Sequence, residues 1–165
     1  MNEIVPTTYI MEDPREAARL EAKVDPEAWV QKYLAHLVSP GAEVLSVGCG
    51  PGVILNAVST LDPSIKATGI DISPERVEEA IERNSDSPQL KFVQGDAQAM
   101  QFASDSFDLV YTRMLLQYLR EKEKVVAEMV RVCRPGGPFY CRIWMDNFCG
   151  TTQRILRCSA QLKKC

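Results

Sequence analysis

The sequence predicts one α/β domain built on a doubly wound, mostly parallel sheet. Three observations lead to this fold class. Short apolar runs rich in β-branched residues alternate with helical segments, turn-forming residues separate the two, and the first apolar run leads into glycines at three alternate positions. Strands that alternate with helices are joined by right-handed crossovers, and such crossovers place the strands parallel to one another in one sheet.

Length and charge suit a single globular domain. The chain has 165 residues, of which 45% are hydrophobic and 25% are charged, as in an ordinary compact domain. A net charge of -3 argues against broad binding to a nucleic-acid backbone, which needs a basic face. No apolar run approaches the length of a membrane span, and residues 1–14 lack the pattern of a secretion signal. We therefore expect a cytoplasmic protein with no nucleic-acid or membrane partner.

The cysteines give no sign of a metal site. There are six, and none forms a C-x-x-C pair, so zinc binding and redox chemistry are not expected. Four of the six fall in the last quarter of the chain, which leaves a disulfide there open. Reduced thiols are the simpler expectation in a reducing compartment.

The stretch from Val44 to Gly52 is predicted to form a strand, a glycine turn and the start of a helix at 53–61. Glycines let the chain reverse sharply and let a ligand approach the backbone more closely than a β-carbon would allow. Asp71 ends a second predicted strand, 67–70, about twenty residues after the glycines, where an acid can bind both hydroxyls of a ribose. This context favours a nucleoside-like ligand over a plain tight turn.

The other elements follow from hydrophobic periodicity and capping residues. They are a helix from Asp25 to about Pro40, a helix beginning at Ser73 and Pro74 with an inward stripe of Val77, Ala80 and Ile81, strands at 90–93, 107–111 and 139–143, and a helix that includes 125–130. Residues 1–24 are predicted to be an arm with a helical stretch, either solvated or acting as a lid. Residues 25–144 form the domain, and 145–165 form a tail that is either a short amphipathic helix or disordered.

Ligand-binding residues are expected at the carboxyl ends of the strands, because ligands of such sheets bind there. The residues gathered at those ends are the glycine turn, Asp71 and Ile72, Asp96 and Ala97, and Thr112 and Arg113. They combine polar groups with small or apolar ones, as a nucleoside site requires. Simpler structural roles stay open for some of them: Asp71 and Asp96 could cap the following helices, and Arg113 could pair with a surface acid.

The chain resembles the class I S-adenosylmethionine-dependent methyltransferases that act on small molecules. The matching stretches, in order, are Val44–Gly52, Gly69–Pro74, Gly95–Ala97, Phe107–Leu119 and Arg134–Gly137. The resemblance covers roughly residues 25–144 and implies a Rossmann-like fold with S-adenosylmethionine as cofactor. It also implies methyl transfer to a small-molecule acceptor.

The resemblance also implies roles for individual residues. Gly48, Cys49 and Gly50, with Gly52 closing the turn, would line the methionine part of the cofactor. Asp71 would bind the ribose hydroxyls and Ile72 would pack on the adenine ring. Asp96 would accept a hydrogen bond from the adenine amino group beside the Ala97 amide. Thr112 and Arg113 would border the methionine end and the entrance for the acceptor.

Two departures from the family pattern are visible. Ser46 stands where the family usually has an acid that supports the glycine turn, and serine offers a hydroxyl without the charge. After the fifth strand, the family continues with a helix and an antiparallel strand pair, and residues 145–165 are too few for all of these. The sheet is therefore expected to lack the family's last strands. Strand 139–143 would then be an unpaired edge through which chains self-associate, unless the tail from Met145 folds back over that edge or a partner supplies the missing strands.

Three functions are compatible with these features. The first is methyl transfer by in-line displacement, which mainly requires that donor and acceptor be held together; no general base is apparent, and the catalytic residues and the acceptor are unknown. The second is a shortened fragment that only binds the cofactor, without catalysis. The third, a nicotinamide-dependent oxidoreductase, is disfavoured because its Gly-x-Gly-x-x-Gly turn would need a glycine at Val53.

Overall fold

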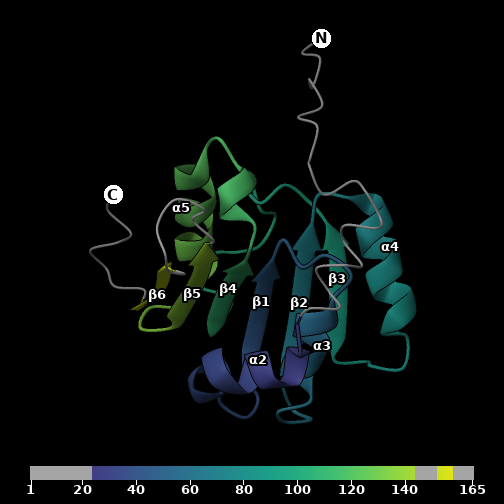
Figure 1. The fold of residues 1–165 in the computed structure, drawn as a ribbon. Helices are drawn as coiled ribbons and strands as arrows, with labels where there is room; N and C mark the ends of the chain where they lie inside the picture. The colour runs from purple at the N-terminus through teal and green to yellow at the C-terminus, as the bar shows by residue number, and fades with distance from the viewer. Residues whose placement is uncertain (1–23, 144–151, 158–165) are drawn as a thin grey trace.

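A computed structural model describes residues 24–143 and 152–157 of the chain, and within them six strands form one sheet in the order β3-β2-β1-β4-β5-β6. The strands are β1 (Glu43–Val47), β2 (Lys66–Asp71), β3 (Leu90–Gln94), β4 (Leu109–Arg113), β5 (Pro138–Ile143) and β6 (Thr152–Arg157). The first five strands are parallel, and β6 runs antiparallel to β5. This order, which reverses direction at β1 (Figure 1), confirms the doubly wound α/β fold.

The described helices are short. They are α2 (Pro26–Tyr33), α3 (Val53–Ser59), α4 (Pro74–Arg83) and α5 (Lys122–Val132), with 3-10 turns η2 (Ala35–Leu37) and η3 (Leu116–Tyr118). The start of α2 is as predicted, because the Asp25 side chain accepts a hydrogen bond from the Ala28 amide at 2.9 Å and Pro26 occupies the first turn. Its end is not, because the helix stops at Tyr33 and continues only as the tighter η2 turn, a common ending.

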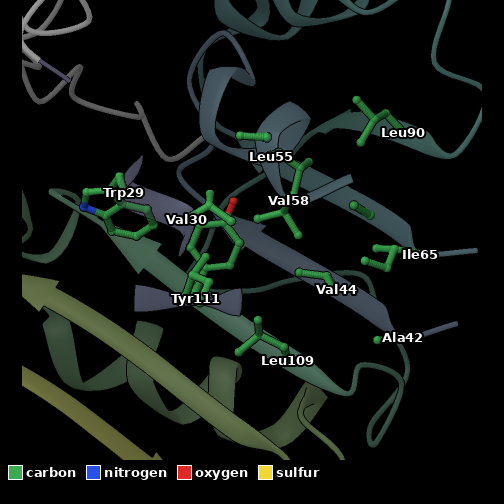
Figure 2. Close-up of a cluster of buried hydrophobic side chains, with 13 residues drawn as sticks. Trp29, Val30, Ala42, Val44, Leu55, Val58, Ile65, Leu90, Leu109 and Tyr111 are labelled. Atoms are coloured by element: carbon green, nitrogen blue, oxygen red, sulfur yellow. The ribbon is translucent and has the colours of Figure 1, made fainter. Parts of the chain in front are cut away.

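Each face of the sheet has its own apolar core. Leu45, Val47 and Val110 pack with buried side chains of α5 on one face. The alternate residues Val44 and Leu109 pack on the other face with buried side chains of α2 and α3 (Figure 2). Successive strand residues point to opposite faces, so these central strands are apolar on both sides. The two cores hold the ends of β1 and β4 in place at the edge where a ligand is expected.

Two predicted details are corrected. The fourth strand begins at Leu109 rather than at Phe107. Phe107 instead makes backbone hydrogen bonds with Val132 and Arg134 and an isolated bridge with Cys133, all near the end of α5. In α4, Ile81 is 51% exposed instead of facing inward. The inner face of that helix instead carries Val77 and Ala80 and continues into the buried Asn84 that follows it.

The expectation of an unpaired edge at the fifth strand is wrong. Residues 152–157 form β6, which pairs with β5 from Pro138↔Arg157 to Ile143↔Thr152. Part of the predicted helical or disordered tail is therefore a strand, and self-association through β5 loses its structural basis. The remaining tail residues and residues 1–23 of the predicted arm lie outside the described residues. The division into arm (1–24), domain and tail therefore stays a prediction.

Over the described part of the chain, no helix is long and apolar enough to cross a membrane. The cytoplasmic location stays a prediction. Neither Cys49 nor Cys133 forms a disulfide with another described residue, and the other four cysteines lie where no side chain is described.

Candidate functional site

The glycine turn after β1 is anchored to the end of β2. The Gly48 and Cys49 amides both donate to the Ile70 carbonyl, at 2.8 and 3.1 Å, and the Gly50 amide donates to Asp71 Oδ2 at 2.8 Å. A carboxylate that accepts from a backbone amide makes a strong, charge-assisted hydrogen bond. Asp71 therefore shapes the turn as well as facing the ligand edge, a role that the sequence did not reveal.

The three glycines of the turn all have left-handed backbone conformations but different surroundings. Their φ angles are 70° at Gly48, 53° at Gly50 and 79° at Gly52. A β-carbon on Gly52 would lie 2.7 Å from the ring of Phe92, whereas one on Gly50 would meet no atom within 4 Å. Gly52 is thus required by packing. Gly50 instead presents bare backbone to open space, as a close-approaching ligand needs.

Asp71 does not cap α4, which removes one alternative to a ligand-binding role. The cap is Ser73, whose hydroxyl accepts from the Arg76 amide at 3.3 Å. Asp71 Oδ1 accepts from the Ser73 amide at 3.1 Å. Each carboxylate oxygen can accept a second hydrogen bond, so both retain capacity for a ligand hydroxyl.

Next to Asp71, an apolar side chain stands in solvent. Ile72 is 60% exposed at the end of β2, where it could cover one face of a flat ligand. Asp96 is exposed after β3, and its Oδ1 accepts from the Gln98 amide at 2.8 Å in a local turn. Ala97 is half-buried against the core. These residues form the β2–β3 side of the candidate site.

The β1–β4 side differs from the expectation for Thr112. Its side chain is fully buried and its hydroxyl donates to the Val47 carbonyl at 2.8 Å, so it joins β4 to β1 within the sheet. Arg113 lies at the end of β4 with its guanidinium carbon 5.8 Å from the centre of the Trp29 ring. This stacking orients the one strand-end cation of the predicted set.

Ser46 lies inside the sheet, paired in register with Tyr111 of β4. Both are almost completely buried, with exposed fractions of 4% and 1%. Burial raises the pKa of Tyr111 well above its usual value, and contact with the Ser46 side chain opposes this shift. That contact falls short of hydrogen-bond geometry, and the Tyr111 hydroxyl has no hydrogen-bond partner among the described residues.

We expect Tyr111→Phe to leave the free energy of unfolding unchanged or to raise it by about 1 kcal/mol, because it removes a buried, unsatisfied hydroxyl while keeping the ring. Urea unfolding measures the difference. The matched control is Tyr33→Phe, since Tyr33 contacts the same Trp29 ring from α2 but is only half-buried. A loss of more than about 1 kcal/mol in Tyr111→Phe alone would show that the hydroxyl has a stabilising partner.

The surroundings of Cys49 disfavour a nucleophilic role. Burial first, and then the nearby Asp71 carboxylate, raise the pKa of its thiol well above the usual value, and the thiolate is the reactive form. Its sulfur instead fills the space above Gly69, where a β-carbon would lie 2.7 Å from Sγ. The Cys49 side chain therefore packs the turn against β2.

The family model described as "Methyltransferase domain" matches residues 45–141, more than half of the chain. The chain belongs to this family. The class I methyltransferase resemblance is thereby confirmed, and S-adenosylmethionine is the family's cofactor.

Curated relatives are similar over the same region. The chain is 39% identical over 110 residues to a phosphatidylethanolamine N-methyltransferase of Cereibacter sphaeroides, covering 65% of this chain and 53% of the relative. It is 37% identical over 120 residues to sterol 24-C-methyltransferase ERG6B of Gibberella zeae, covering 70% and 31%. The chain thus spans about a third to a half of the length of these relatives.

Solved structures share the fold. The YcgJ protein of Bacillus subtilis has a TM-score of 0.63 at 26% identity, with 72% of this chain and 50% of that chain covered. A SAM-dependent methyltransferase from Aquifex aeolicus has a TM-score of 0.70 at 22% identity, with 82% and 75% covered. At that identity, the second likeness shows the fold alone.

Proposed function

We propose that this chain binds S-adenosylmethionine at the carboxyl edge of its sheet and transfers the methyl group to a small-molecule acceptor. The observation that carries the proposal is the open backbone of Gly50, whose amide is bonded to the Asp71 carboxylate beside the exposed Ile72. Close backbone approach, a hydroxyl-binding acid and an apolar platform are what a nucleoside needs. The residues present therefore fit the cofactor.

Individual residues keep their predicted roles as part of this proposal. Asp71 would accept from the ribose hydroxyls, Ile72 would cover the adenine, and Asp96 with the Ala97 amide would bind the adenine edge. The methionine part would lie against the glycine turn, at Gly48, Cys49, Gly50 and Gly52. Arg113 would border that part. Ser46 and Thr112 would act from within the sheet, because both are buried there.

The protein's part in the reaction is to position the cofactor and the acceptor and to exclude water. When bound, the cofactor would supply an electrophilic methyl group on a sulfonium, so that a bond from an acceptor lone pair to the methyl carbon forms as the carbon–sulfur bond breaks and sulfur keeps that bond's electrons. The turn and strand ends would hold that centre at attack distance from the acceptor. The raised pKa values of Cys49 and Tyr111 keep both side chains protonated near neutral pH, so neither serves as the general base.

A chain that only binds the cofactor is the second candidate. The observation that favours it is that the curated relatives are two to three times longer than the region they share with this chain. Turnover separates the two functions: transfer of a radiolabelled methyl group to phospholipid or sterol acceptors, the classes in the relatives' names, would establish catalysis. Binding of S-adenosylhomocysteine without transfer to any acceptor would favour the binding module. The family match disfavours the nicotinamide oxidoreductase.

The test of the cofactor site is Gly50→Ala, with Gly136→Ala as its matched control. Both glycines have left-handed φ angles, 53° and 80°, and neither has an atom within 4 Å of an added β-carbon. Both variants should lose about 1–2 kcal/mol of folding free energy from backbone strain. Only Gly50→Ala should also weaken S-adenosylhomocysteine binding, by at least about tenfold in calorimetry, or about 1.4 kcal/mol. Equal affinities in the two variants would contradict the site.

A further inference from the structure

A non-glycine residue with a left-handed backbone stands directly after β4. Met114 has a φ of 61°, and this conformation costs an ordinary side chain about 1–2 kcal/mol. Among the described residues the other case is Asp105, and aspartate tolerates this region better than methionine does. Strain of this kind persists where the surrounding structure imposes it, and it gathers at functional sites.

The bend at Met114 changes the direction of the next side chain. Leu115 packs against the apolar core that contains Leu45, Val47 and the buried residues of α5. It also lies against the glycine turn, because a β-carbon on Gly48 would be 3.0 Å from Leu115 Cδ2 and 3.2 Å from its Cβ. Leu115 therefore fills the space beside Gly48 that any larger residue at position 48 would need.

The contact lies on one particular side of the candidate site. Sheet order places β1 between β2 and β4. Asp71, Ile72 and Asp96 follow β2 and β3, whereas Leu115 follows β4 and contacts Gly48 from the β4 side. The nucleoside-binding features therefore lie on the side of β2 and β3. The amino-acid end of the cofactor, which extends beyond the nucleoside, must then run toward β4.

We propose that Met114 and Leu115 are positioning residues that fix the glycine turn for the amino-acid end of the cofactor. This inference rests on the proposed function. The bend at Met114 sets Leu115 against Gly48, and Leu115 holds Gly48 in its left-handed conformation. The turn, whose amides are bonded to Ile70 and Asp71 on the β2 side, then keeps one backbone arrangement on the side that Leu115 contacts. Neither side chain takes part in the chemistry.

Two ligands distinguish binding at the nucleoside end of the site from binding at the amino-acid end. S-adenosylhomocysteine has both the nucleoside and the amino-acid end, whereas 5′-methylthioadenosine keeps the nucleoside and sulfur but lacks the amino acid. Leu115→Ala is expected to weaken S-adenosylhomocysteine binding by about tenfold, equivalent to 1.4 kcal/mol, and to leave methylthioadenosine within about twofold. The matched control is Leu119→Ala, since Leu119 is a partly buried leucine on the same core. It should leave the ratio of the two affinities unchanged.

The bend is tested at Met114 itself. Met114→Gly accommodates a left-handed φ without strain and should keep the wild-type melting temperature and both affinities. Met114→Val is β-branched and disfavours that φ, so it should show the selective loss seen in Leu115→Ala. Melting temperatures confirm that each variant is folded.

The outcomes distinguish this inference from the proposed function. The inference is overturned if Leu115→Ala weakens both ligands equally, if Leu119→Ala has the same selective effect, or if Met114→Val binds as wild type does. In each of these cases, wild-type binding of both ligands would leave the cofactor assignment intact. A folded wild-type protein that binds neither ligand would overturn both.

Discussion

Asp71→Ala should weaken S-adenosylhomocysteine binding by about 2–3 kcal/mol, the scale for losing charged hydrogen bonds to a desolvated partner. The structure adds a second effect. The carboxylate also accepts from the Gly50 and Ser73 amides, at 2.8 and 3.1 Å, so the variant should lose about 1–2 kcal/mol of folding free energy as well. Calorimetry and urea unfolding on the same samples measure the two losses.

Two further variants show which of the two losses in Asp71→Ala comes from the cofactor contact and which from the turn. Asp71→Asn keeps an acceptor oxygen for the Gly50 amide but loses the charge, so it should recover more of the folding free energy than of the affinity. Asp86→Ala, at an exposed acid beyond α4, should change neither. If Asp71→Ala binds as tightly as Asp86→Ala does, then Asp71 only anchors the turn and does not contact the cofactor.

Arg131→Gln should have the largest effect on stability away from the candidate site, a loss of about 2–3 kcal/mol. The Arg131 guanidinium donates to the Met100 and Phe102 carbonyls, both at 2.8 Å, and its Nε donates to Glu128 Oε1 at 2.6 Å. Glu128 in turn accepts from the Met100 amide at 2.7 Å. Together these bonds tie the loop after Asp96 to α5, so cofactor affinity should fall too.

The loss of folding free energy in Arg131→Gln should depend on pH. The Arg131 guanidinium, opposed by partial burial, lowers the pKa of Glu128 below its usual value. A carboxyl group whose folded pKa is depressed stabilises the fold fully above its unfolded pKa, about 4.3, and less as pH falls through the folded pKa. The difference between wild type and Arg131→Gln should therefore be full near pH 7 and shrink below about pH 4.

Lys124→Gln is the control for Arg131→Gln, because Lys124 makes an i,i+3 ion pair with Glu121 on the exposed side of the same helix. Exposed pairs of this kind contribute between zero and about 1 kcal/mol. A similar loss in both variants would show that the loop contacts of Arg131 add little. A loss in Arg131→Gln that does not change with pH would contradict the role of Glu128.

The fold was predictable because its determinants are local or periodic. The apolar run at 44–47, the glycines after it and the cap at Asp25 all signal their structure within a few residues. The corrections come from contacts between distant residues. Phe107 makes its backbone hydrogen bonds near the end of α5 instead of within the sheet. β6 exists because residues 152–157 pair along all of β5. A short segment of mixed polar and apolar residues gives no local signal of such pairing.

The candidate site shows the same division. Glycine spacing and the position of Asp71 predicted where a nucleoside would bind, because each is a local pattern at the end of a single strand. The anchoring of Gly50 by Asp71 joins residues 21 positions apart, and the contact of Leu115 with Gly48 depends on a backbone angle at Met114. The sequence carries no local sign of either, since methionine and leucine are ordinary core residues.

The central position of β1 affects how the chain can fold as it is synthesised. Two hydrogen bonds join β1 to the β4 region: Thr112 donates to the Val47 carbonyl, and the Glu43 amide donates to Asp108 just before β4. Each connects residues 65 positions apart. Contacts of such long range form slowly, because a large loop must close first. Until β4 has left the ribosome, one edge of β1 has no native neighbour. The glycine turn at its end is therefore completed late, when the β4 segment carrying Leu115 arrives.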